Sequence, residues 1–92
     1  MSITRESAYL YLCSKELAKL NKKLHDAGQE AQKLAQKYHQ AADEKTRYKY
    51  GKKHHQALEE RGNLMKEYRE MLSRTKHHLV NFNNALRKEL KQ

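Results

Sequence analysis

The chain has 92 residues, 37% hydrophobic and 34% charged, with no proline, no tryptophan and three glycines. Twenty lysine and arginine residues against eleven aspartate and glutamate residues give a formal net charge of +9. We expect one all-helical domain, 1–92, because this composition is lean for a compact globule and typical of amphipathic helices that proline does not interrupt.

Cys13 is the only cysteine, which excludes an intrachain disulfide and a cysteine-rich zinc site. No stretch approaches the roughly 20 apolar residues of a membrane span, and the N-terminus lacks the apolar core of a signal peptide. A single free thiol is typical of a reducing compartment. We therefore expect a cytoplasmic protein without integral membrane insertion, although leaderless secretion would leave no mark in the sequence.

The first predicted helix, residues 4–50, follows an a/d heptad row. Its members are Ile3, Leu10, Cys13, Leu17, Leu20, Leu24, Ala27, Ala31, Leu34, Tyr38, Ala41 and Tyr48, with Lys45 as the polar interruption. Thr4 is the predicted N-cap. The row passes through Gly28 without losing phase, which favours a continuous helix there. Such a row is stable only when it packs against another helix.

The predicted bend covers residues 51–55, because Gly51 suits the position after a helix end. A second row, offset by one residue, predicts a helix over 56–90. Its members are Leu58, Arg61, Met65, Tyr68, Leu72, Thr75, Leu79, Phe82 and Leu86. The two helices form an antiparallel hairpin with coiled-coil-like heptads. Centred near Lys53, this hairpin pairs Leu24 with Phe82 and Tyr38 with Tyr68.

An alternative fold is a three-helix bundle with breaks near Gly28 and Gly62, because Gly62-Asn63 is a favourable turn dipeptide. In the two-helix hairpin, some apolar residues lie beside the heptad rows, where a single hairpin would leave them in water. We expect these to carry self-association into a homodimer, a four-helix bundle of two hairpins. They are Tyr9, Leu12, Leu64, Met71 and Val80.

Residues 45–55 carry five basic side chains and no acidic one, which is more than half of the net charge. The basic residues are Lys45, Arg47, Lys49, Lys52 and Lys53, and Tyr48 and Tyr50 alternate with them. Cations with aromatic faces suit single-stranded nucleic acid, whose phosphates and bases they contact. The same surface suits an acidic protein, and it also fits a loop that is only solvated.

The sequence contains no recognisable catalytic, cofactor or metal signature. None of the six histidines are spaced four apart, and there is no His-Glu-x-x-His motif. The predicted hairpin brings His25 near His77 or His78, but carboxylates do not complete a metal site there. We expect no enzyme, no cofactor and no metal.

The sequence thus favours a non-enzymatic protein–protein interaction or assembly protein, such as a small adaptor, regulator or inhibitor. It would present a basic surface to a larger partner. The alternative is a nucleic-acid-binding helical protein that uses Lys45–Lys53. The two differ in salt response, because polyanion binding releases counterions and weakens steeply as salt rises.

Overall fold

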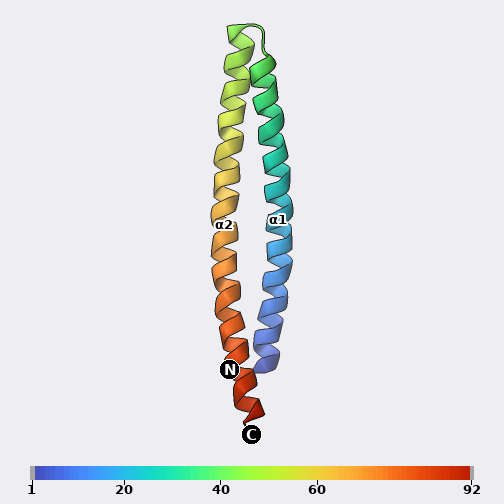
Figure 1. The fold of residues 1–92 in the computed structure, drawn as a ribbon, viewed down its shortest axis with the longest axis vertical. Helices are drawn as coiled ribbons and strands as arrows, with labels where there is room; N and C mark the ends of the chain where they lie inside the picture. Colours follow the sequence, from blue (N-terminus) through green and yellow to red (C-terminus); the bar gives the residue numbers. More distant parts are fainter. Residues whose placement is uncertain (1, 92) are drawn as a thin grey trace. The chain divides into compact units, whose positions relative to one another are not determined.

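The computed structural model describes residues 2–91 and contains two helices, α1 (Ile3–Gln40) and α2 (Glu44–Leu90) (Figure 1). No strand occurs among these residues. The all-α prediction is therefore confirmed. Both helices run through their glycines, Gly28 in α1 and Gly62 in α2, without interruption, so the three-helix alternative is wrong.

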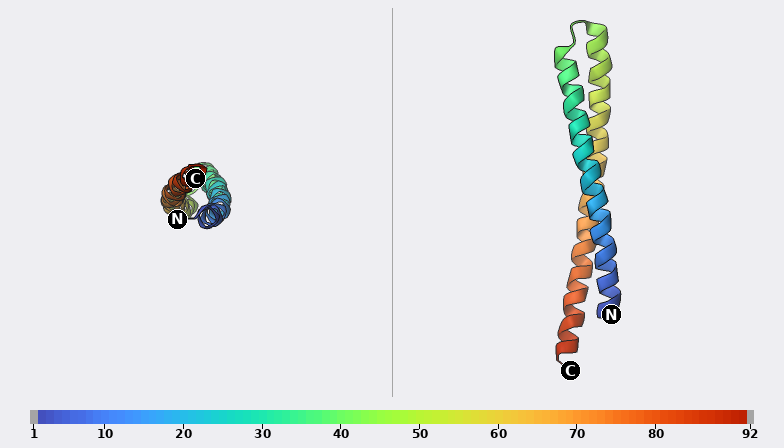
Figure 2. Two further views of the ribbon diagram at one scale, coloured as in Figure 1. Left: turned by 90° about the horizontal axis from the view of Figure 1, so that it is seen from below. Right: turned by 90° about the vertical axis from the view of Figure 1, so that its right-hand side faces the viewer.

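Contacts between Cα atoms divide the chain into two compact units. The terminal unit combines the residues before Asn21 with those after Lys66, and the connection unit is Asn21–Lys66. Within each unit, a segment of α1 lies beside an antiparallel segment of α2 (Figures 1 and 2). The connection unit is thus a helical hairpin, closed by residues 41–43.

The predicted bend at residues 51–55 is wrong, because α1 ends at Gln40 and α2 begins at Glu44. Asp43 caps the new helix: its Oδ1 accepts a hydrogen bond of 3.3 Å from the backbone N–H of Thr46. Gly51 lies inside α2, and no described glycine has a positive φ. Its missing side chain serves packing instead, since a Cβ there would lie 3.2 Å from the Tyr38 ring.

The helix start is also displaced from its predicted position. Ser2, not Thr4, is the N-cap, because Ser2 Oγ accepts a hydrogen bond of 3.1 Å from the backbone N–H of Arg5. The backbone N–H of Glu6 donates to the Ser2 carbonyl at 3.1 Å. Glu6 thereby falls in the first turn, where a helix favours an acidic side chain.

The heptad row predicted for α1 is confirmed as its buried face. Cys13, Leu20, Ala31 and Leu34 are buried, and the row's remaining members between Ile3 and Ala27 are half-buried. Tyr38 is more exposed, at 36%. We call the facing rows of the two helices the seam.

The seam of α2 differs from the predicted row. Its members are Ala57, Leu64, Tyr68, Met71, Thr75, His78, Phe82 and Ala85, all of them buried or half-buried. Only Tyr68, Thr75 and Phe82 belong to both rows. The earlier connection changes every pairing between the helices: Tyr38 lies against Gly51, and Leu24 and Phe82 belong to different units.

Little apolar surface is buried in this fold. Only five hydrophobic residues count as buried among those described: Cys13, Leu20, Ala31, Leu34 and Ala85. Twelve large hydrophobic residues remain exposed, mostly on α2. A single chain of this size gains limited stability from such a core, so covering its exposed apolar rows would stabilise it further.

Candidate interaction site

The basic segment predicted for the bend lies instead in the first three turns of α2. We define the basic segment as Lys45, Arg47, Tyr48, Lys49, Tyr50, Lys52 and Lys53. All five cationic side chains are exposed, so each can reach a partner. Lys45 and Arg47 lie in the first turn of α2, where the positive end of the helix dipole adds to the positive potential.

Tyr50 gathers three lysines around one aromatic ring. The ammonium nitrogens of Lys37, Lys49 and Lys53 lie 5.6, 5.9 and 5.8 Å from the centroid of the ring. Cations over an aromatic face are attracted by its negative potential. Lys37 comes from the last turns of α1, and the sequence analysis missed it because the predicted bend placed it far from Tyr50.

Tyr48 is the most exposed aromatic ring of the basic segment, at 74%, so it lies outside the seam row predicted for it. It lines two open surface grooves, of about 580 and 610 Å³. Lys52 lines both grooves with it, and Glu44 contributes an acid to the first. Four lysines line the second groove, which therefore has a basic lining: Lys45, Lys49, Lys52 and Lys53.

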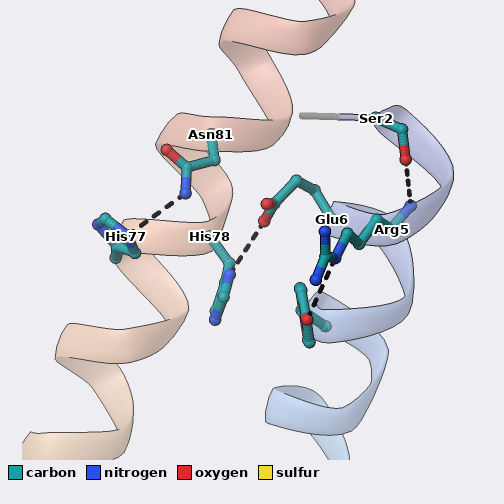
Figure 3. Close-up of polar contacts among 7 residues, drawn as sticks. Ser2, Arg5, Glu6, His77, His78 and Asn81 are labelled. Carbon is teal, nitrogen blue, oxygen red and sulfur yellow. Dashed lines mark hydrogen bonds and ion pairs between the residues drawn. The ribbon is translucent and has the colours of Figure 1, made fainter.

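The terminal unit contains a second polar cluster, centred on Glu6 (Figure 3). Glu6 is only 4% exposed, and its Oε2 accepts a hydrogen bond of 2.9 Å from Nδ1 of His78. The Tyr9 ring stacks on His78 with 4.8 Å between centroids, and the guanidinium Nε of Arg5 donates to the Tyr9 hydroxyl at 3.3 Å. Nearby, His77 and Asn81 are joined by a hydrogen bond of 3.3 Å.

This cluster corrects the predicted pairing of His25 with His77 or His78, since the partner of His78 is Glu6. The sequence contained a signal for Glu6 that was not used. Counting back one heptad from Cys13 reaches position 6, so the α1 row has a carboxylate at a buried position. A buried carboxylate requires a hydrogen-bond donor, which His78 supplies.

The residues predicted to carry self-association fall into two groups. Tyr9, Leu12 and Val80 are exposed, at 36%, 59% and 50%. Leu64 and Met71 are half-buried members of the α2 seam. Self-association through these residues stays a prediction.

Between residues 2 and 91, no group of three or more histidine, cysteine, aspartate or glutamate side chains is placed to hold a metal ion. Over the same range, no helix combines the length and apolar character of a membrane span. Comparison of the chain with protein-family models, curated proteins and solved structures finds no match.

Proposed function

We propose that this chain is a non-enzymatic protein–protein interaction or assembly protein that presents the basic segment to an acidic surface of a larger partner. The observation that carries this proposal is the gathering of exposed cations around Tyr50, joined by Lys37 from the other helix. It would act as a small adaptor, regulator or inhibitor.

The chemistry of the segment favours a protein partner. Four of its five cations are lysines, which act as flexible point charges, whereas arginine is the usual residue for planar, bidentate recognition of phosphate. Several carboxylates spread over a protein surface can each meet one ammonium group. Their binding would also relieve the mutual repulsion of neighbouring lysines.

The working form in this proposal is a homodimer in the cytoplasm. The free thiol of the buried Cys13 fits a reducing compartment, and the small core favours a second copy. A dimer would present two basic segments to its partner.

The exposed ring of Tyr48 supports a second candidate, binding of single-stranded nucleic acid. A ring that is 74% exposed among lysines can stack on a base while the cations contact phosphates. Stacking distinguishes this function from binding to an acidic peptide, which needs the cations alone.

The test compares a polyglutamate peptide with a mixed-sequence single-stranded oligonucleotide, each titrated into the protein at low and moderate salt. A triple variant, Lys49→Glu, Lys52→Glu and Lys53→Glu, is expected to abolish binding of the functional ligand. Its matched control is Lys15→Glu, Lys19→Glu and Lys22→Glu, which makes the same change in net charge at exposed positions of α1. Equal losses in both variants would show that net charge, not the segment, is responsible.

The variant Tyr48→Ala then separates the two candidates. If a base stacks on the ring, this variant should raise the dissociation constant for the oligonucleotide by about tenfold or more. Affinity for polyglutamate should be nearly unchanged. Wild-type protein that binds neither ligand at low salt would contradict both candidates.

A further inference from the structure

Five large hydrophobic side chains on α2 form a row outside the seam. We call it the leucine ridge: Leu58, Met65, Leu72, Leu79 and Leu86. The members are spaced seven residues apart, about two helical turns, and are 36% to 48% exposed. Each directly follows a seam residue, as Leu79 follows His78, so the ridge flanks the seam along one side.

On α1, a row of small side chains occupies the equivalent positions. We call it the small row: Ser7, Ser14, Asn21, Gly28 and Ala35, again with seven-residue spacing. Each of these also directly follows a seam residue, as Ser7 follows Glu6. In facing antiparallel helices, equivalent heptad positions flank the seam on the same side. The leucine ridge and the small row therefore border the same face within each unit.

The opposite side of the seam carries charge. In the connection unit, one surface groove is lined by Glu30 and Lys37 of α1 together with Lys53 and Glu60 of α2. Glu30 and Lys37 directly precede Ala31 and Tyr38 of the α1 row. Lys53 and Glu60 hold the equivalent heptad position on α2, fourteen and seven residues before Glu67, which precedes Tyr68. Their shared groove agrees with the rule that equivalent positions lie on one side, and it leaves the ridge and the small row on the other.

The face that bears the small row lacks formal charge, although 34% of the chain is charged. None of the next residues outward on α1 is Asp, Glu, Lys or Arg; they are Thr4, Tyr11, Ala18, His25, Gln32 and His39. On the outer flank of the leucine ridge, Arg69 and Lys76 are the only such residues between Tyr48 and Leu90. A heptad pattern that is apolar at three positions rather than two is typical of helices in a bundle, not of a single two-helix seam.

We propose that this face binds the same face of a second copy of the chain, with the leucine ridge of each copy packed on the small row of the other. The inference rests on the self-association in the proposed function and specifies its surface. Three observations identify a second copy as the occupant: the fit in side-chain size, the lack of charge, and the small core of one chain alone.

Two copies related by a two-fold axis parallel to the seam place α2 of one copy over α1 of the other. This arrangement brings the large side chains of one copy against the small side chains of the other. In the terminal unit, Ser7 and Leu79 each follow a member of the Glu6–His78 pair, and because the helices are antiparallel their levels differ by only about 3 Å. The same holds for Ser14 and Leu72, one heptad further into the unit. Large side chains then meet small ones, as close packing requires.

The lack of charge matters because two copies of a chain with a net charge of +9 repel each other. This face, which carries only Arg69 and Lys76 as formal charges on its α2 flank, is where they can approach with least repulsion. An acidic partner would find few cations to bind on this face. A second copy that binds here keeps its own lysine and arginine side chains away from those of the first copy. The small core adds a driving force, since the interface removes the leucine ridge from water.

The first test measures mass by light scattering during gel filtration. Leu72→Glu with Leu79→Glu is expected to convert a dimer into a monomer. The comparison variant, Leu12→Glu with Val80→Glu, adds the same charge at 59% and 50% exposed positions outside the face, which the sequence alone predicted to carry self-association and this proposal does not. It should remain dimeric, with far-ultraviolet circular dichroism reporting helix content in both variants.

Gly28 provides a variant that does not depend on removing a hydrophobic side chain. A Cβ at Gly28 meets nothing within 4 Å in the single chain, and glycine disfavours helix, so Gly28→Arg should not reduce helicity. In the proposed dimer the arginine would occupy the small row and raise the dissociation constant about tenfold or more. Gly28→Ala, which keeps a small side chain, should leave the dimer intact.

The outcomes distinguish failure of the face from failure of the proposed function. If the comparison variant is monomeric while both ridge and Gly28→Arg variants remain dimeric, self-association stands but this face is wrong. A wild-type protein that is monomeric at every concentration overturns self-association and this inference together. Ligand binding by the basic segment is measured separately and is unaffected by either result.

Discussion

Nδ1 of His78 donates a hydrogen bond of 2.9 Å to the carboxylate of Glu6, joining residues 72 positions apart in the chain. Glu6 is the buried polar residue of the described seam, and the stacked ring of Tyr9 covers His78. A buried carboxylate without its donor is unfavourable, so this pair fixes which residues of α1 and α2 face each other.

Removing the donor should therefore destabilise the protein. We expect His78→Ala to lower the free energy of unfolding by about 1–3 kcal/mol, because Glu6 loses its partner. In a Glu6→Leu background, His78→Ala should lower the free energy of unfolding by clearly less. Urea unfolding at one fixed protein concentration measures both steps, with the exposed His77→Ala as the control. An equal cost in the two backgrounds would exclude coupling between the residues.

The glycines should respond differently to alanine. Gly28→Ala is expected to stabilise the chain by about 0.5–1 kcal/mol, because alanine favours helix and its Cβ meets nothing within 4 Å. Gly51→Ala should stabilise less or destabilise, because its Cβ would lie 3.2 Å from the Tyr38 ring. Thermal unfolding of both variants tests this. Equal gains would mean that the Tyr38 ring moves away freely.

The cap at Asp43 should make stability depend on pH. The hydrogen bond from Thr46 holds the pKa of Asp43 below its ordinary value of 3.8 in the folded protein. This stabilisation is present above the ordinary value and is lost as the pH falls through the lower, folded-state pKa. Asp43→Ala should lower the unfolding midpoint at neutral pH, and its difference from wild type should shrink in strong acid.

The variant Asp43→Asn is the control for that experiment, because asparagine can cap the helix but does not titrate. It should keep most of the stability at neutral pH. A difference between Asp43→Ala and wild type that is constant across the acid range would show that the ionised carboxylate is not responsible.

The proposed dimer also predicts the placement of its two basic segments. A two-fold axis along the seam pairs each connection unit with the connection unit of the other copy, so the two basic segments lie in neighbouring units. Ala42→Cys, in the exposed connection, can carry donor and acceptor dyes, while the native Cys13 is buried and protected. Mixed labelled copies should transfer energy efficiently. A dimer without transfer would show that the hairpins are opposed.

The first helix was predictable because its apolar residues recur where a seam needs them. The bend was not predictable, because a glycine can either end a helix or allow a neighbouring side chain to pack closely. Gly51 does the second, beside the Tyr38 ring. Asp43 followed by Thr46 is a cap signal that the sequence contained. The phase of α2 was misassigned because the ridge leucines are more hydrophobic than His78, Ala57 and Ala85, which the structure places in the seam.

The basic segment was predictable as a run of charge, since local composition was enough to find it. Its relation to Lys37 was not, because that depends on where the chain turns. Finding the face formed by the leucine ridge and the small row required knowledge of the seam. Only the observed phase shows that leucines on one helix and small residues on the other border the same side.

The position of the connection has a consequence for how the chain acquires its structure. Contacts in the connection unit begin between neighbours of residues 41–43, so little chain entropy is lost in forming them. Contacts in the terminal unit join residues such as Glu6 and His78, which close a far larger loop. Folding should start beside the connection and proceed away from it along both helices, so that the residues before Asn21 gain their partners only after the residues that follow Lys66 have been synthesised.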